Sequence, residues 1–134
     1  MKIKTTKSTF KMVPEGDVTL LVTDVKIVPA GRPQFVEFYY SHENGGTARE
    51  KFDLNHEIAK SILGRRIDVA LGGSVEEGTE FDLDDIPSMF NGKYVDALVE
   101  HNVVEKEGKK RTYANIKYIT AVYGIDAEDE DDDL

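Results

Sequence analysis

The chain has no cysteine, only three histidines and no long apolar run. Without cysteine there are no disulfide bonds, thiolate zinc sites or cysteine nucleophile, and His42, His56 and His101 are too scattered to suggest a histidine cluster. No apolar stretch approaches the roughly 20 residues of a membrane span, and MKIKTTKSTF lacks the charged and then apolar pattern of a signal peptide. We therefore expect a cytoplasmic protein that makes no membrane contact and depends on packing for stability.

Acidic charge is concentrated at one end of the chain. The 134 residues include 26 acidic and 17 basic ones, a formal net charge of −9. Seven of the acids lie between residues 126 and 133 with no base among them, which leaves 19 acids against 17 bases, or −2, for the rest. We therefore expect one compact domain over residues 1–124 and a disordered acidic tail over residues 125–134.

Basic residues gather in two places along this nearly neutral body. The first group lies at the N-terminus and comprises Lys2, Lys4, Lys7 and Lys11. The second lies late in the chain and comprises Lys106, Lys109, Lys110, Arg111 and Lys117. This distribution predicts a polarised molecule with local positive surfaces.

Five segments have the residue pattern of β-strands. They cover residues 17–28, 34–40, 47–54, 93–104 and 111–122. In the first segment the apolar alternation changes parity across Asp24, which predicts a β-bulge. The Asn44-Gly45-Gly46 run predicts a tight reversal between the second and third strands, and residues 105–109 are expected to turn the chain between the last two.

A helix is expected between the third and fourth strands. Asn55 would cap it, apolar residues follow at helical spacing from Ile58 to Leu63, and Gly64 stops or loosens it. Residues 65–73 fit either an extension of this helix or a short strand. Arg65 and Arg66 are expected at the surface as partners of the helix dipole or as solubilising residues, and not as ligands of the nucleic acid. A second, short helix is expected to end near Phe90, capped by Asp82 or Asp84 and limited in length by Pro87.

Three strands, a helical insertion and two further strands follow the order of the OB fold, a five-stranded barrel that commonly binds oligonucleotides. We therefore expect a mainly β protein with this architecture. The chain also resembles phage-encoded single-stranded DNA-binding proteins in residues 16–26 and 31–36, in residues 81–85 and 91–102, and in its acidic tail. The resemblance implies a sequence-independent binder that coats single-stranded DNA during phage DNA replication or recombination in an infected bacterial cell.

Binding of a single strand needs cations for the phosphates and flat aromatic rings on which bases stack. The second strand should expose Phe35 and Tyr39 on the face opposite Phe38 and Tyr40. On the last strand, Ala114, Ile116 and Tyr118 should share one face, with Tyr113, Asn115 and Lys117 on the other. Any single aromatic residue could instead pack in the sheet, but the set indicates a nucleic-acid interface. The expected interface comprises Arg32, Phe35, Tyr39, Arg49, Lys51, Tyr94, Lys109, Lys110, Arg111, Tyr113 and Lys117.

The tail is expected to have two roles. It would occupy the basic groove when DNA is absent, and it would recruit replication or recombination proteins. The residues expected to do this are Asp129, Glu130, Asp131, Asp132, Asp133 and Leu134. Bacterial single-strand binders resemble this chain in carrying acidic tails with an apolar end, although the Ile-Pro-Phe ending of their tails is missing here. The alternative is a tail that only increases solubility.

We expect no enzymatic activity, cofactor or metal. Asp82, Asp84 and Asp85 lack the spacing of a calcium loop and fit helix capping better, and no nucleophile or phosphate-loop motif is present. Two other function classes stay open, a protein-interaction module of the OB type and an acidic DNA mimic that inhibits a host nuclease. Free edge strands would also allow a homo-oligomer.

Overall fold

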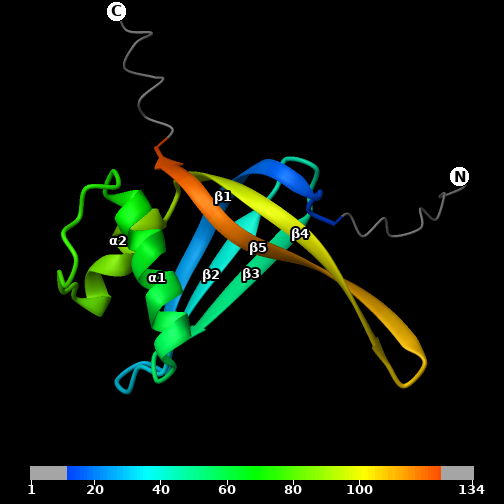
Figure 1. Cartoon of the computed structure of the whole chain (residues 1–134), viewed down its shortest axis with the longest axis horizontal. Coiled ribbons are helices and arrows are strands. Elements are labelled where there is room, and N and C mark those ends of the chain that lie inside the picture. Colours follow the sequence, from blue (N-terminus) through cyan, green and yellow to red (C-terminus); the bar gives the residue numbers. More distant parts are fainter. Residues whose placement is uncertain (1–11, 125–134) are drawn as a thin grey trace, which may run out of the picture.

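The computed structural model describes residues 12–124 and shows a mainly β chain (Figure 1). The elements in order are β1 (Gly16–Val28), β2 (Phe35–Ser41), β3 (Thr47–Asp53), α1 (Glu57–Ala70), η1 (Leu83–Asp85), α2 (Ile86–Phe90), β4 (Tyr94–Lys106) and β5 (Lys109–Tyr123). All five expected strands are present. The part of the chain that is described contains no helix long and apolar enough to cross a bilayer.

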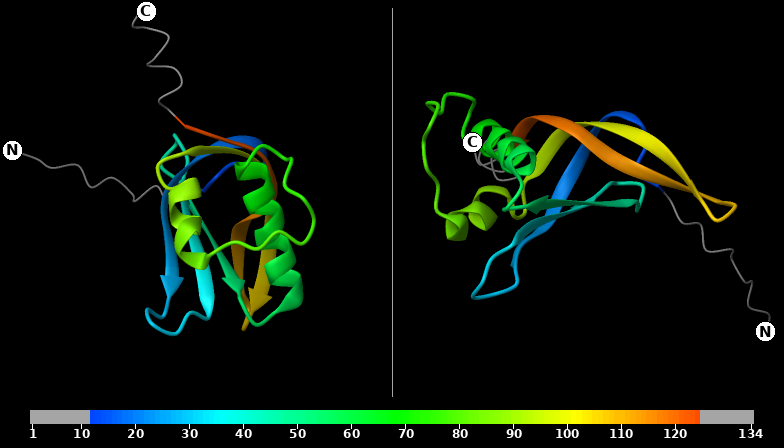
Figure 2. Two further views of the ribbon diagram at one scale, coloured as in Figure 1. Left: turned by 90° about the vertical axis from the view of Figure 1, so that its left-hand side faces the viewer. Right: turned by 60° about the horizontal axis from the view of Figure 1, so that its bottom comes forward.

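The five strands form one antiparallel sheet in the order β3-β2-β1-β4-β5. The first half of β1 pairs with β4 and its second half pairs with β2, and the register shifts between Val22 and Asp24. The predicted bulge is thereby confirmed. The sheet coils so that its edge strands β3 and β5 come into contact (Figures 1 and 2), although within residues 12–124 no hydrogen-bonded ladder closes the seam between them.

The hairpin between β4 and β5 is longer than the sequence predicts. Its turn consists of only Glu107 and Gly108, with φ angles of 55° and 77°, and Lys106 pairs directly with Lys109. Two residues at positive φ match the right-handed twist of paired strands, so the ladder continues to the tip. Residues 102–113 are all exposed and project from the sheet as an arm (Figure 2). We call this segment the β4–β5 arm.

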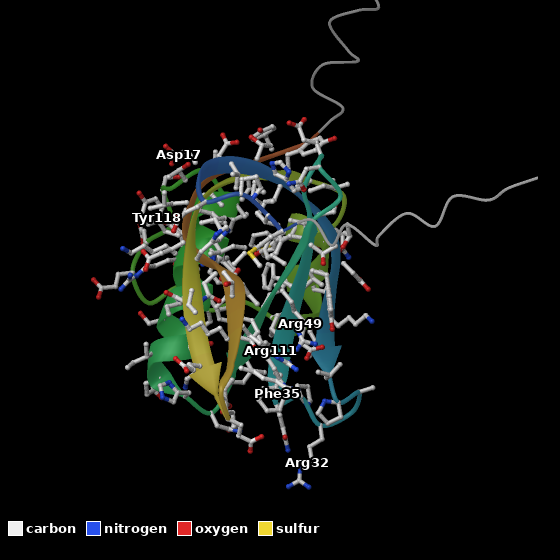
Figure 3. The ribbon with its side chains drawn as sticks, turned by 90° about the vertical axis from the view of Figure 1, so that its right-hand side faces the viewer. Asp17, Arg32, Phe35, Arg49, Arg111 and Tyr118 are labelled. Carbon is white, nitrogen blue, oxygen red and sulfur yellow. The ribbon has the colours of Figure 1, made fainter. Side chains whose placement is uncertain are left out.

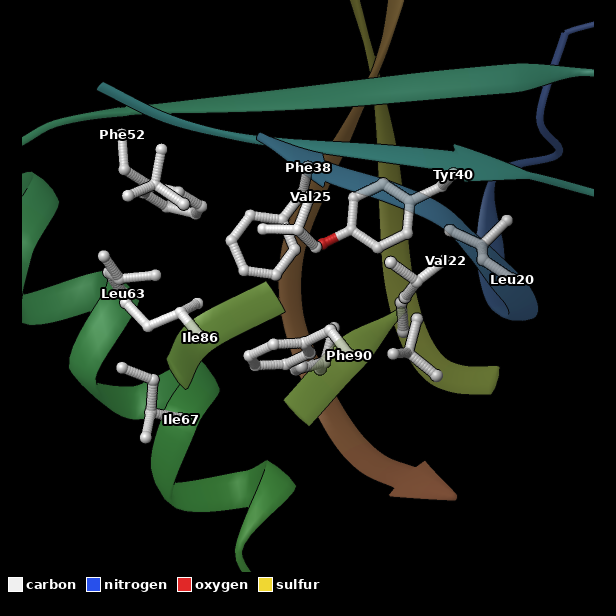
Figure 4. Packing of buried hydrophobic residues seen from close by; sticks show 14 of the residues in the cluster. Leu20, Val22, Val25, Phe38, Tyr40, Phe52, Leu63, Ile67, Ile86 and Phe90 are labelled. Atoms are coloured by element: carbon white, nitrogen blue, oxygen red, sulfur yellow. The ribbon is translucent and has the colours of Figure 1, made fainter. Parts of the chain in front are cut away.

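The core lies between the concave face of the sheet and the two helices (Figure 4). Phe38 on β2 is fully buried at its centre, with its ring centroid 5.6 Å from that of Phe52 and 4.8 Å from that of Phe90 in edge-to-face contacts. Helix α1 contributes the buried side chains of Leu63 and Ile67 to this core. Burial of such a side chain stabilises the fold by about 1.5–3 kcal/mol.

Helix α1 differs from the prediction at both ends. Its N-cap is His56, whose ring Nδ1 accepts a hydrogen bond from the Ala59 amide at 3.4 Å, so the prediction of Asn55 was wrong. The helix also continues through Gly64 to Ala70, which decides the open question about residues 65–73 in favour of helix. A glycine costs a helix only about 1 kcal/mol, less than the burial of Ile67 one turn later contributes.

Arg66 is buried, so its predicted place at the surface was wrong, whereas Arg65 is exposed as expected. The Arg66 Nη2 lies 2.7 Å from Glu50 Oε2, and the other oxygen of that carboxylate accepts a hydrogen bond from the Tyr40 hydroxyl at 2.7 Å. Position 66 lies three residues after Leu63, on the inward side of the helix. This network ties α1 to β2 and β3. Burial, with the Glu50 carboxylate next to it, raises the pKa of Tyr40 well above 10.0.

The residues that lead into β1 are anchored on two sides. Val13 is fully buried, and its carbonyl accepts a hydrogen bond from the His101 ring Nε2 at 2.7 Å. The Glu15 carboxylate accepts from the His101 amide at 2.9 Å, while Asn44 Nδ2 donates to the Met12 carbonyl at 3.0 Å. This segment therefore links β4 to the turn between β2 and β3.

Candidate nucleic-acid interface

The outer face of β2 carries the aromatic residues that the sequence predicts there. Val36, Phe38 and Tyr40 are buried, whereas Phe35 and Tyr39 lie half-buried on the opposite face. The alternation of the strand sets this arrangement, because consecutive side chains point to opposite sides of a sheet. Pairing with β3 places Arg49 beside Tyr39 and Lys51 beside Glu37, which itself lies between the two rings along β2.

Two lysines lie over these rings. The Lys51 Nζ is 4.1 Å from the Phe35 ring centroid, and the Lys26 Nζ is 5.1 Å from that of Tyr39. Glu37 accepts a hydrogen bond from the Tyr39 hydroxyl at 2.7 Å and lies 3.9 Å from Lys51. A base that stacked on either ring would displace a long flexible side chain, whose ammonium group would then be free to meet a phosphate.

Three depressions follow one another from this face to the β4–β5 arm. The first is lined by Thr23, Tyr39, Tyr40, Thr47, Ala48 and Arg49. The second lies at the seam and is lined by Met12, Thr47, Ala48, Arg49, Thr112, Tyr113, Ala114 and Asn115. The third runs along the arm and is lined by Val104, Lys106, Glu107, Lys109, Arg111 and Tyr113. Because residues 47–49 belong to the first two and Tyr113 to the last two, we treat them as one surface, the β3–β5 track.

The track brings together five of the predicted interface residues. These are Tyr39, Arg49, Lys109, Arg111 and Tyr113. Figure 3 shows Arg49, Arg111, Phe35 and Arg32 one below the other on this side of the molecule. Phe35 and Lys51 extend the same β2–β3 face beyond the track, Arg32 is exposed in the following loop, and Lys110 is exposed on the arm.

Two predicted residues lie elsewhere. The ring centroid of Tyr94 is 6.1 Å from that of Tyr123, and Tyr94 lines a separate depression together with Asp17 and Glu43. Lys117 has its Nζ 3.2 Å from Glu100 Oε2. The structure therefore does not bring Tyr94 and Lys117 together with the track.

Tyr118 is also placed differently from the prediction. It is 46% exposed and pairs with Leu98 on the outer face, so the expectation that it shares a face with Ala114 and Ile116 was wrong. The register shifts between Leu98 and Val99, which leaves Lys117 as an extra residue in β5. A bulge of this kind moves the following side chains to the opposite face, here until a second register shift between Asp96 and Ala97 leaves Thr120 as another extra residue.

The positive charge of the described surface is local. The β4–β5 arm carries Lys106, Lys109, Lys110 and Arg111 against Glu105 and Glu107. Over residues 12–124 as a whole there are 13 basic and 19 acidic residues, a formal net charge of −6. A strand of phosphates would therefore be attracted to the arm and repelled by much of the remaining surface.

Several residues at this surface were not among those predicted from the sequence, and Lys26, Asn115 and Met12 show why. Lys26 follows the bulge in β1, so its outward parity could have been derived from Val25 and Ile27. Asn115 was assigned to the correct face but not to the interface. No local signal placed Met12 at the seam, because its partners there come from β3 and β5.

Within residues 12–124, no group of three or more histidine, aspartate or glutamate side chains is arranged to hold a metal ion. The predicted tail residues Asp129–Leu134 lie outside the described part of the chain. Comparison with protein-family models and with curated proteins gives no match.

Proposed function

We propose that the chain is a single-stranded DNA-binding protein that coats DNA without sequence preference during phage DNA replication or recombination in the cytoplasm of the host. The observation that carries this proposal is the β3–β5 track. It joins two tyrosines, the half-buried Tyr39 and the 47% exposed Tyr113, to cations in adjoining depressions. These cations are Arg49, Lys109 and Arg111. Aromatic platforms beside a basic groove are the two parts that single-strand binding requires.

Each part of the track has a separate chemical role. Tyr39 and Tyr113 offer π-faces to unpaired bases, and every base has a face that can stack. Arg49 and Arg111 provide guanidinium groups for the phosphates between those bases. Stacking and phosphate contacts do not read base edges, so we expect little sequence preference. Paired bases are already stacked within a duplex, so duplex DNA should bind weakly.

We also propose that this five-stranded sheet is an OB fold. The strand order, the contact between β3 and β5, and the position of α1 directly after β3 are consistent with it. In OB folds, oligonucleotides bind to the face of strands 2 and 3 and to the loops after strands 1 and 4. The corresponding positions here are the β2–β3 face, the loop that contains Arg32, and the tip of the β4–β5 arm.

We further propose that the acidic tail covers the basic surface and recruits replication or recombination proteins. The described chain ends just after Tyr123, at the opposite end of β5 from the arm (Figure 1). The eleven residues 124–134 extend up to about 36–40 Å, and the ten steps along β5 from Tyr123 back to Tyr113 cover about 33 Å. These residues can therefore reach Tyr113 in their own chain.

A protein-interaction module is the second candidate function. It is favoured by exposed tyrosines that lie off the track, Tyr118 at 46% and Tyr123 at 41% exposure, since aromatic residues at a surface often mark protein contacts. On this reading the basic arm would bind an acidic partner protein instead of DNA.

Fluorescence anisotropy distinguishes the two candidates. Labelled poly-dT, a matched duplex and a matched RNA are titrated with the full chain and with a chain truncated after Ile125, each at two salt concentrations. Tight, salt-sensitive binding to poly-dT with little binding to the duplex supports the proposed function. No binding to any nucleic acid by either chain refutes it and leaves the protein-interaction module.

A further inference from the structure

We propose that two lysines, Lys26 and Lys51, form a phosphate-binding site on the outer face of the sheet, between the two aromatic rings of β2. In the free protein each lysine lies over one ring, and it turns to a phosphate when a base stacks on that ring. This inference rests on the proposed function and extends it to Lys26 of β1, which lies outside the predicted interface. It also gives Glu37 a role as the residue that positions the lysines.

The strand register carries the inference. Glu37 on β2 pairs with Lys26 on β1 and with Lys51 on β3, so the three side chains form one row across the outer face of three strands. Phe35 and Tyr39 lie two positions before and two positions after Glu37 on the same face of β2, so the row separates the two rings. A single strand with bases stacked on both rings would therefore carry its phosphates across this row.

Neither lysine is held firmly where it lies. The Nζ atoms of Lys51 and Lys26 are 4.1 Å and 5.1 Å from the ring centroids, and each is 3.9 Å from a carboxylate oxygen. Both side chains are about half exposed. Ion pairs and cation–π contacts contribute little at exposed sites. A phosphate, which accepts charge-assisted hydrogen bonds from ammonium groups, can therefore replace these partners.

Glu37 connects the lysine row to the aromatic rings. Its side chain is only 13% exposed, and its two oxygens have different partners. Oε1 accepts the hydrogen bond from the Tyr39 hydroxyl at 2.7 Å, and Oε2 lies 3.9 Å from the Lys51 ammonium group. One carboxylate thereby restrains the Tyr39 ring and keeps Lys51 near Phe35. Its negative charge also opposes a phosphate above the row, so Glu37 sets how readily the lysines exchange partners.

The first test measures how the affinity of the full chain for poly-dT depends on salt. On single strands, each neutralised phosphate contributes about 0.7 to the slope of log K against log salt concentration, so Lys26→Gln should reduce the magnitude of the slope by about 0.7. Lys60→Gln is the matched control, because Lys60 is similarly exposed and also belongs to an ion pair, but lies on α1 at the other face of the sheet. It should leave the slope unchanged. Equal slopes for the two variants, or tighter binding by Lys26→Gln, overturn the inference while the proposed function stands.

A second pair of variants tests the positioning role of Glu37. Glu37→Gln keeps an oxygen that can accept from the Tyr39 hydroxyl but removes the charge. The Kd for poly-dT at low salt should therefore fall about fivefold, the effect of removing a unit charge about 4 Å from a phosphate in water. Glu57→Gln removes the same charge from the ion pair on α1 and should change the Kd much less. Equal changes in the two variants, or weaker binding by Glu37→Gln, overturn the positioning role. If the wild-type chain does not bind poly-dT at low salt, the inference and the proposed function both fail.

Discussion

Replacement of Tyr113 by alanine should weaken binding to single-stranded DNA far more than it weakens the fold. Tyr113 is 47% exposed and belongs to two of the three depressions of the track. Loss of one base-stacking aromatic costs about 1–3 kcal/mol of binding free energy, which corresponds to an increase of about 5- to 140-fold in Kd. Because only about half of the side chain is buried, the loss in unfolding free energy should be about 1 kcal/mol.

Tyr118 provides a matched control on the same strand. It is 46% exposed but does not line the track. Tyr118→Ala should therefore cost a similar amount of unfolding free energy and leave the Kd for oligo-dT within about twofold of wild type. Anisotropy titrations give the two Kd values, and urea unfolding gives the two stabilities. Equal effects of the two substitutions on binding would refute the assignment of Tyr113 to the interface.

Three further predictions concern the tail and the buried network. Truncation after Ile125 should tighten oligo-dT binding at low salt, because the tail would no longer compete with DNA for the basic surface. An unchanged affinity would exclude cover by the tail. Arg66→Met should lower the unfolding free energy measured in urea by about 3–5 kcal/mol, because it leaves the Glu50 carboxylate without its cation. Adding Glu50→Gln should recover part of this loss. A loss below about 1 kcal/mol would show that the ion pair contributes little to stability. The pKa of Tyr40 is raised in the folded chain, so the unfolded chain loses the hydroxyl proton at a lower pH. The stability that this shift contributes is therefore complete below pH 10.0 and is lost as pH rises through the folded pKa. Tyr40→Phe should flatten the fall in unfolding free energy above pH 10.0, and identical pH profiles for the two chains would contradict a raised pKa at Tyr40.

The features that the sequence predicted correctly are local ones. Strand alternation located all five strands and the inward face of β2, and a parity change located the bulge near Asp24. These properties follow from the two-residue period of a strand, which can be read from neighbours in the chain.

The features that it missed depend on contacts between distant segments. The seam joins Met12, Arg49 and Tyr113, which come from three separate parts of the chain. The burial of Arg66 is made possible by Glu50 on β3, and the extra residue at Lys117 depends on the pairing of β5 with β4. Residue periodicity does not encode such pairings, because each is set by how the sheet coils and by what the helix covers.

The most direct test of the central claim is to identify which residues contact a bound single strand. Ultraviolet cross-linking of the full chain to oligo-dT, followed by mass spectrometry of the linked peptides, reports this for the aromatic residues. Cross-links at Tyr39 and Tyr113, suppressed by unlabelled oligo-dT in excess, are the predicted result. Cross-links at Tyr94 and Tyr118 with none on the track would contradict the proposed interface.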